Sequence, residues 1–215
     1  MRSLAVAVAL GSTLAMAEGV AAGSPTSAAY SVTFQGSWSM ETHPLKFPPN
    51  AHFSGLIGAT HNSHYTIFRE GGRATEGLER LAEAGRHSPL DEEIKGAAQA
   101  GTVGALIESG PIKPVPGQVQ AVFEVDDSHP IISLVAMIAP SPDWFTGVSV
   151  NLNENGQWLA EKTITAYAWD AGTDVGSTYQ APDANSREKV TVNTAPHFQN
   201  AGKLAPVGTF TFVRQ

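Results

Sequence analysis

The stretch IISLVAMIAPSPDWF, residues 131–145, decides the fold class of this chain. Its first part, residues 131–138, is apolar except for Ser133, which is typical of a central strand with both faces covered. Pro140 and Pro142 follow, and proline is a frequent turn residue that a central strand does not tolerate. Asp143 comes directly after them, so an acidic side chain is expected at the point where a buried strand leaves its sheet.

Other segments alternate apolar and polar residues with period two, as strands with one buried face do. The clearest are VQAVFEV at 119–125, YSVTF at 30–34 and TFTF at 209–212. Further strands are expected at 65–68, 148–152, 163–169 and 190–192. About eight short strands separated by Gly, Pro, Asn or Asp predict an all-β chain, folded as a sandwich or a barrel.

Helical signals are confined to a short insertion at about residues 74–100. In its first half, Leu78 and Leu81 share a helical stripe, with Thr75 as the expected N-cap and Gly85 as the expected stop. A second helix is expected from Ser88-Pro89, with Ser88 as N-cap and Pro89 as the first helical residue. The two helices are expected to fold over one end or edge of the sheets.

The N-terminus has the pattern of a secretory signal peptide. Arg2 precedes an apolar run, and Ala15 and Ala17 form an A-x-A cleavage signature, so cleavage after Ala17 is expected. The prediction divides the chain into a signal peptide (1–17), a flexible leader (18–29) and one domain (30–215). No later segment is long and apolar enough to span a bilayer. The expected location is therefore secreted, or periplasmic or at the cell surface.

Composition excludes several function classes. The chain has 20 acidic and 13 basic residues and a formal net charge of −7, so bulk electrostatics disfavour nucleic acid and anionic membranes as partners. It has no cysteine, which excludes thiol catalysis, cysteine-ligated zinc and iron–sulfur clusters. Acidic side chains gathered in loops can still hold a divalent cation.

Three aspartates are the candidate metal ligands. Asp143 follows the strand at 131–138, while Asp170 and Asp174 bracket the segment DAGTD after the strand at 163–169. Three carboxylates with carbonyl and water oxygens make an all-oxygen shell, which suits Ca²⁺ better than zinc. The alternative is that these side chains only cap turns, because aspartate is frequent in turns for that reason.

The chain resembles the spondin domain, the N-terminal module of F-spondin-like extracellular matrix proteins. The resemblance runs from Tyr30 to about Thr194, in the order FQGSWS (34–39), AHFSGLIGATHN (51–62), the helix with LAE (81–83), the stretch 132–148 and DAGTD (170–174). The number and order of these motifs make it specific.

This resemblance implies an antiparallel β-sandwich similar to C2 domains, with Ca²⁺ held by loops at one end. In the family the aspartates of PSPDW and DAGTD are calcium ligands, which implies that Asp143, Asp170 and Asp174 bind the ion. The implied function is a secreted, non-catalytic module for adhesion or surface and matrix interaction. The partner is an unidentified extracellular protein, glycan or anionic lipid. Animal spondin domains usually carry cysteines, which this chain lacks.

Two alternative functions stay open on the sequence. His52, His61 and His64 would serve an exported metal-dependent hydrolase, although their spacing matches no known ligand motif and lacks the glutamate of H-E-x-x-H. Calcium could instead bridge the chain to anionic lipid, as in C2-like domains. The four tryptophans are interpreted as core or edge residues more readily than as a sugar-stacking platform.

Overall fold

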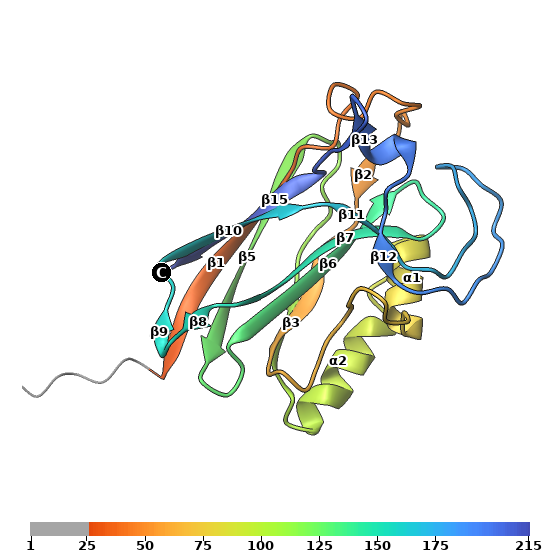
Figure 1. Ribbon diagram of the computed structural model, residues 1–215. Helices are drawn as coiled ribbons and strands as arrows, with labels where there is room; N and C mark the ends of the chain where they lie inside the picture. The colour runs from red at the N-terminus through yellow and green to blue at the C-terminus, as the bar shows by residue number, and fades with distance from the viewer. Residues whose placement is uncertain (1–25) are drawn as a thin grey trace, which may run out of the picture.

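The computed structural model describes residues 26–215 and shows two antiparallel sheets packed face to face (Figure 1). The predicted signal peptide lies outside these residues. The smaller sheet has the order β10-β15-β1-β5, formed by Glu161–Ala166, Gly208–Arg214, Ser27–Gly36 and Gly117–Asp126. β1 thus begins three residues before the Tyr30 start that the alternation predicts.

The larger sheet runs β12-β11-β7-β6-β3-β4, with β2 also paired to β6. These strands are Thr191–Val192, Ala168–Asp170, Trp144–Asn151, Ile131–Ala139, Ile57–His61, Val103–Glu108 and His52–Phe53. Two small hairpins, β8–β9 (Asn153–Glu154, Gln157–Trp158) and β13–β14 (Gln199–Asn200, Lys203–Leu204), and a 3₁₀ turn at Pro196–Phe198 complete the fold. The predicted all-β antiparallel sandwich is confirmed.

The core follows from the alternation of the strands. In the smaller sheet, Phe34 and Phe210 turn inward and stack with their ring centroids 4.4 Å apart. From the facing sheet, Leu134 and its neighbours at every second position of β6 enter the same cluster. Each such fully buried side chain contributes roughly 1.5–3 kcal/mol. As the sequence predicts, β6 is covered on both faces.

The helices form a third layer over the outer face of the larger sheet. α1 (Glu76–Ala84) and α2 (Leu90–Gln99) pack Leu78 and Ile94 into a second cluster with Val135 of β6. The expectation that they cover an end or edge was therefore wrong. The reason is that the odd-numbered β6 residues, such as Val135, also need an apolar cover.

The predicted cap of α1 is confirmed, and that of α2 is wrong. The Thr75 hydroxyl accepts a hydrogen bond from the Leu78 N–H, and Gly85 ends α1 in the left-handed conformation. α2 begins at Leu90 after Pro89, with no side-chain cap. Its Glu93 instead turns toward α1, where it accepts hydrogen bonds from the Thr75 hydroxyl and the Gly77 N–H.

Two strand predictions fail for identifiable reasons. Residues 65–68 are irregular: their apolar side chains pack against the helices, while the Thr66 hydroxyl donates to the Phe68 carbonyl. The expected strand at 163–169 is two strands, because the chain leaves β10 at Ala166 and enters the other sheet as β11 at Ala168. The alternation of apolar and polar residues indicates which side chains are buried, but it does not indicate which strand the segment pairs with.

The tryptophans serve the packing, as expected. Trp38, Trp144 and Trp158 are buried, and Trp169 is half-buried against Phe68. Within residues 26–215, neither helix has the length and apolar character needed to cross a lipid bilayer.

Candidate metal centre

Strand pairing brings two of the three candidate aspartates together. β11 pairs with β7 so that Asp170 lies opposite Trp144, the residue after Asp143. The Ala171 N–H donates to the Asp143 carbonyl at 3.1 Å, which extends this pairing by one step. Asp143 and Asp170 are 27 residues apart in the sequence, and the antiparallel pairing of β7 with β11 brings them together.

The Asp143 side chain lies inside the turn that follows β11. Its Oδ2 accepts hydrogen bonds from the backbone N–H groups of Thr173 at 2.8 Å and Asp174 at 3.2 Å. The side chain has no solvent exposure, and its other oxygen, Oδ1, is buried without a hydrogen-bond partner. A buried carboxylate oxygen without a partner costs free energy, so a water molecule or a cation beside it would stabilise the fold.

The segment 170–176 is a tight turn held by its own aspartates. Asp170 Oδ1 accepts from the Gly172 N–H at 2.9 Å, and Gly172 has a positive φ of 72°. Asp174 Oδ1 accepts from the Gly176 N–H at 2.5 Å, and its Oδ2 accepts from the Ala184 N–H at 2.8 Å. The turn-capping role considered from the sequence is therefore real for Asp170 and Asp174.

The electrostatics of the cluster favour a cation. Burial, followed by the charge of Asp170, raises the pKa of Asp143 to about 6. Burial likewise raises the pKa of Asp170, partly offset by the hydrogen bond from Gly172. Among residues 26–215, none of the ion pairs involves Asp143, Asp170 or Asp174. The cluster thus holds negative charge without a basic neighbour to balance it.

The acids do not by themselves complete a metal shell. In the part of the chain that the structure describes, no three His, Cys, Asp or Glu side chains converge as ligands of one ion. A cavity of about 300 Å³ adjoins the cluster, lined by Trp144, Asp170, Asp174 and Asn193 among others. Asp170 and Asp174 line this cavity and Asp143 does not, so water and carbonyl oxygens, from which Ca²⁺ takes much of its coordination, can reach the first two carboxylates directly.

A larger cavity of about 760 Å³ lies between the same turn and α1. It is lined by Gly172 and Thr173 on one side and by Glu76 and Glu79 on the other, and none of the three aspartates reaches it. Its position makes it a separate feature from the candidate metal centre.

Comparison with known proteins agrees with this fold and these motifs. The sequence profile of the spondin N-terminal domain (Spondin_N) matches residues 28–202. The chain belongs to the spondin N-terminal domain family. The match includes all three aspartates and both helices, so the candidate metal centre lies within the part of the chain that carries the spondin likeness.

Curated relatives are similar over most of this spondin domain. Rat spondin-2 is 34% identical over 203 residues, which cover 87% of this chain and 62% of that protein. Mouse spondin-1 is 36% identical over 165 residues, which cover 73% of this chain and 20% of that protein. The chain therefore spans less than two thirds of spondin-2 and about a fifth of spondin-1.

The three histidines of the hydrolase alternative are not brought together in this spondin domain. His61 is buried on β3, where its Nδ1 donates to the Asn62 carbonyl and its Nε2 lies 2.7 Å from the Ser133 hydroxyl. Burial lowers the pKa of His61, which keeps the ring neutral. His52 hydrogen bonds to the Asn50 carbonyl, and His64 is exposed. These are structural contacts.

Sequence reasoning missed the segment that closes the site. Residues 175–190 fold back over the turn, so that Ala184 donates to Asp174 and Asn185 forms a bridge with it. Ser186 and Glu188 add hydrogen bonds to the carbonyls of Thr173 and Gly172. This segment has neither strand nor helix periodicity, so the sequence pattern contained no signal for its position.

Proposed function

We propose that this chain is an exported, calcium-binding spondin module that mediates adhesion or contact with a surface or matrix, without catalysis. One observation carries the calcium proposal: Asp143 Oδ1 is buried and unpartnered, and the charges of Asp170 and Asp174 both act on its carboxyl group. The pattern at residues 1–17 and the membership of the spondin family support export. The proposed role in adhesion rests on the family resemblance, which is to a module of extracellular matrix proteins.

The chemistry of the donors suits Ca²⁺. Asp143, Asp170 and Asp174 offer only carboxylate oxygens, and the other polar residues that line the adjoining cavity are two serines, Asn193 and Glu188. Each capping oxygen of Asp170 and Asp174 retains a lone pair after it has accepted one backbone hydrogen bond. The bound ion would neutralise the cluster and fix the segment 171–190 as a surface for a partner.

Calcium titration tests the proposal. Ca²⁺ at a hundredfold excess over its dissociation constant adds about 2.7 kcal/mol to the free energy of unfolding. In a chain of this size, that raises the melting temperature by about 5–10 °C. Asp174→Asn should abolish the rise. Asp127→Asn, which changes an exposed acid on the turn between β5 and β6, should leave it intact.

The same preparation separates calcium from the hydrolase alternative. Elemental analysis should find calcium and no transition metal in protein purified without chelator. Retained zinc that disappears in His61→Ala would favour the histidine site instead. Identical melting curves in calcium and in chelator would remove the calcium proposal.

A further inference from the structure

β5 forms one edge of the smaller sheet, and β4, the edge strand of the larger sheet, lies near it without pairing. β5 is ten residues long and pairs with β1 in an uninterrupted register, from Ser27 opposite Asp126 to Gly36 opposite Gly117. Within residues 26–215 no strand pairs along its other side. Such an edge presents unpaired N–H and C=O groups to any extended chain that approaches it.

β5 has little of the usual protection of an edge strand. Natural edges are shortened, bulged, covered, or marked with proline or with charged residues, especially lysine. β5 is long and regular, its sequence GQVQAVFEVD contains neither lysine nor proline, and its charged residues, Glu124 and Asp126, are confined to its second half. The opposite edge of the same sheet, β10, has only six residues and carries Lys162. The two edges of one sheet therefore differ in how readily they can accept another strand.

The outer face of β5 has an apolar centre. Val122 is 75% exposed, which is the largest exposed fraction among the large hydrophobic side chains of the described residues. Gln118 and Gln120 precede it on the same face, and Glu124 and Asp126 follow it. The outer face of β5 thus carries two amide side chains before Val122 and two carboxylates after it.

We propose that β5 pairs antiparallel with β5 of a second copy of this chain, with Val122 opposite Val122. Successive residues of a strand direct their backbone groups to opposite edges, and the two residues of an antiparallel pair must both direct them toward the shared edge or both away from it. The two-fold axis of a symmetric pair therefore passes through a residue and never between two residues. Val122 is the centre that the side chains favour.

This register makes the outer face self-complementary. It places Gln120 opposite Glu124 and Gln118 opposite Asp126 in each direction, so amide donors meet carboxylate acceptors. No like charges lie opposite each other, which is the arrangement that destabilises a strand pair. Moving the axis to position 121 or 123 places Val122 opposite Gln120 or Glu124 instead, and the apolar contact is lost.

The inner face is also compatible with this register. Ala121 lies opposite Phe123, and Val119 lies opposite Val125. All four are apolar and belong to or pack against the core between the sheets. Pairing would continue that core across the axis and would cover the half-buried Val119 and Ala121.

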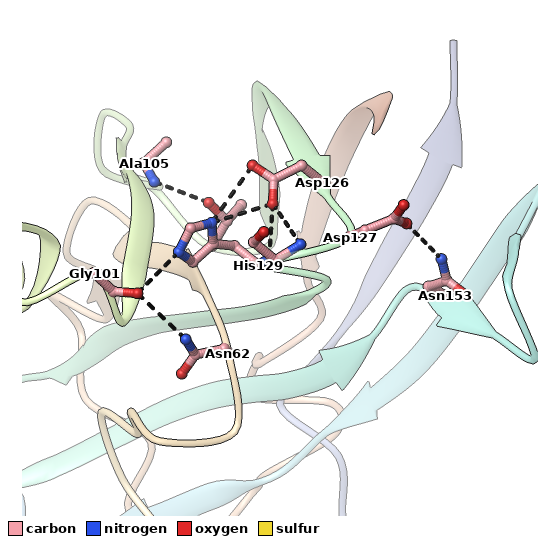
Figure 2. Close-up of polar contacts among 9 residues, drawn as sticks. Asn62, Gly101, Ala105, Asp126, Asp127, His129 and Asn153 are labelled. Atoms are coloured by element: carbon pink, nitrogen blue, oxygen red, sulfur yellow. Dashed lines mark hydrogen bonds and ion pairs between the residues drawn. The ribbon is translucent and has the colours of Figure 1, made fainter. Parts of the chain in front are cut away.

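The turn that follows β5, on the way to β6 in the other sheet, defines the end of this edge (Figure 2). Asp126 Oδ1 accepts hydrogen bonds from the N–H groups of Ser128 and His129, both at 2.8 Å. His129 in turn reaches the Gly101 carbonyl at 3.4 Å. The turn therefore holds Asp126 in place, and Oδ2 makes fewer hydrogen bonds within the chain than Oδ1.

Light scattering at increasing protein concentration tests the pairing. The wild-type chain should approach the mass of a dimer, in chelator as well as in calcium, because β5 is remote in the fold from the aspartate cluster. Val122→Lys places two cations opposite each other and should raise the dimer dissociation constant at least about tenfold. Val213→Lys, on the interior strand β15, is the matched control and should leave it unchanged.

Cysteine crosslinking tests the register, since the chain has no cysteine of its own. Val122→Cys should form a disulfide-linked or bis-maleimide-linked dimer. Gln118→Cys is also exposed, but its two copies would stand roughly 27 Å apart at 3.4 Å per residue, so it should not crosslink. A wild-type monomer at all concentrations, a dimer insensitive to Val122→Lys, or equal crosslinking of both variants would overturn the proposal.

Discussion

Asp143→Asn is expected to change stability in opposite directions with and without calcium. Asparagine keeps an oxygen that accepts the hydrogen bonds from Thr173 and Asp174, and it removes the buried charge. In chelator at neutral pH, the variant should therefore be more stable than the wild type. In calcium the order should reverse, because the variant loses a carboxylate ligand.

The size of the effect follows from the pKa of Asp143, which rises from 3.8 to about 6 in the folded chain. At 1.36 kcal/mol for each pKa unit, ionising Asp143 costs the ion-free fold up to about 3 kcal/mol above pH 6. The native state binds the proton more tightly than the unfolded state. Stability is therefore highest below pH 3.8 for this group and is lost as the pH rises through 6.

Urea unfolding at several pH values, with chelator or with calcium, measures both effects. In chelator, the advantage of Asp143→Asn should be largest at pH 7–8 and should vanish as the pH falls below about 4. The reasoning is refuted if the variant is the less stable protein in chelator at neutral pH while its calcium response equals that of the wild type. Asp127→Asn provides the control for removal of an exposed charge.

Two further substitutions test the local structure. Gly172→Ala should lower the free energy of unfolding by about 1–3 kcal/mol and weaken calcium binding, because φ is 72° and a Cβ would lie 2.7 Å from the Glu188 backbone; unchanged urea unfolding would contradict this. Thr75→Ala should cost about 1 kcal/mol through loss of the α1 cap, with no change in calcium affinity. A changed affinity in calorimetry would show that α1 and the turn are coupled.

The sequence was informative wherever local chemistry decides the structure. The strands at 30–34, 119–125 and 131–138 are present because alternate side chains are buried, and Thr75 and Gly85 delimit α1 because their chemistry suits the two helix ends. The switch between sheets at Tyr167 could not be predicted in this way. It depends on which strand lies alongside, and that is a property of the assembled sandwich.

The candidate site was predictable only in part. The sequence placed Asp143 and Asp170 at strand ends, and the register of β7 and β11 explains why they meet. The hydrogen bond between Ala184 and Asp174 could not be predicted from the sequence, because Ala184 lies ten residues further along in a segment without periodicity. Burial of Asp143, which raises its pKa, was not predictable either, because its side chain lies against Thr173 and Asp174, which are distant in the sequence.

The turn and the metal interpretations of the aspartates are compatible, because the structure divides the carboxylate oxygens between them. Asp170 Oδ1, both oxygens of Asp174 and Asp143 Oδ2 accept backbone N–H groups and hold the turn. Asparagine, with one acceptor oxygen, could replace Asp143 and Asp170 in the turn but not Asp174, and turn formation gives no reason for the buried, unpartnered Asp143 Oδ1. A cation would satisfy that oxygen and the unbalanced charge together, so the feature that turn chemistry leaves unexplained is the one that calcium binding requires.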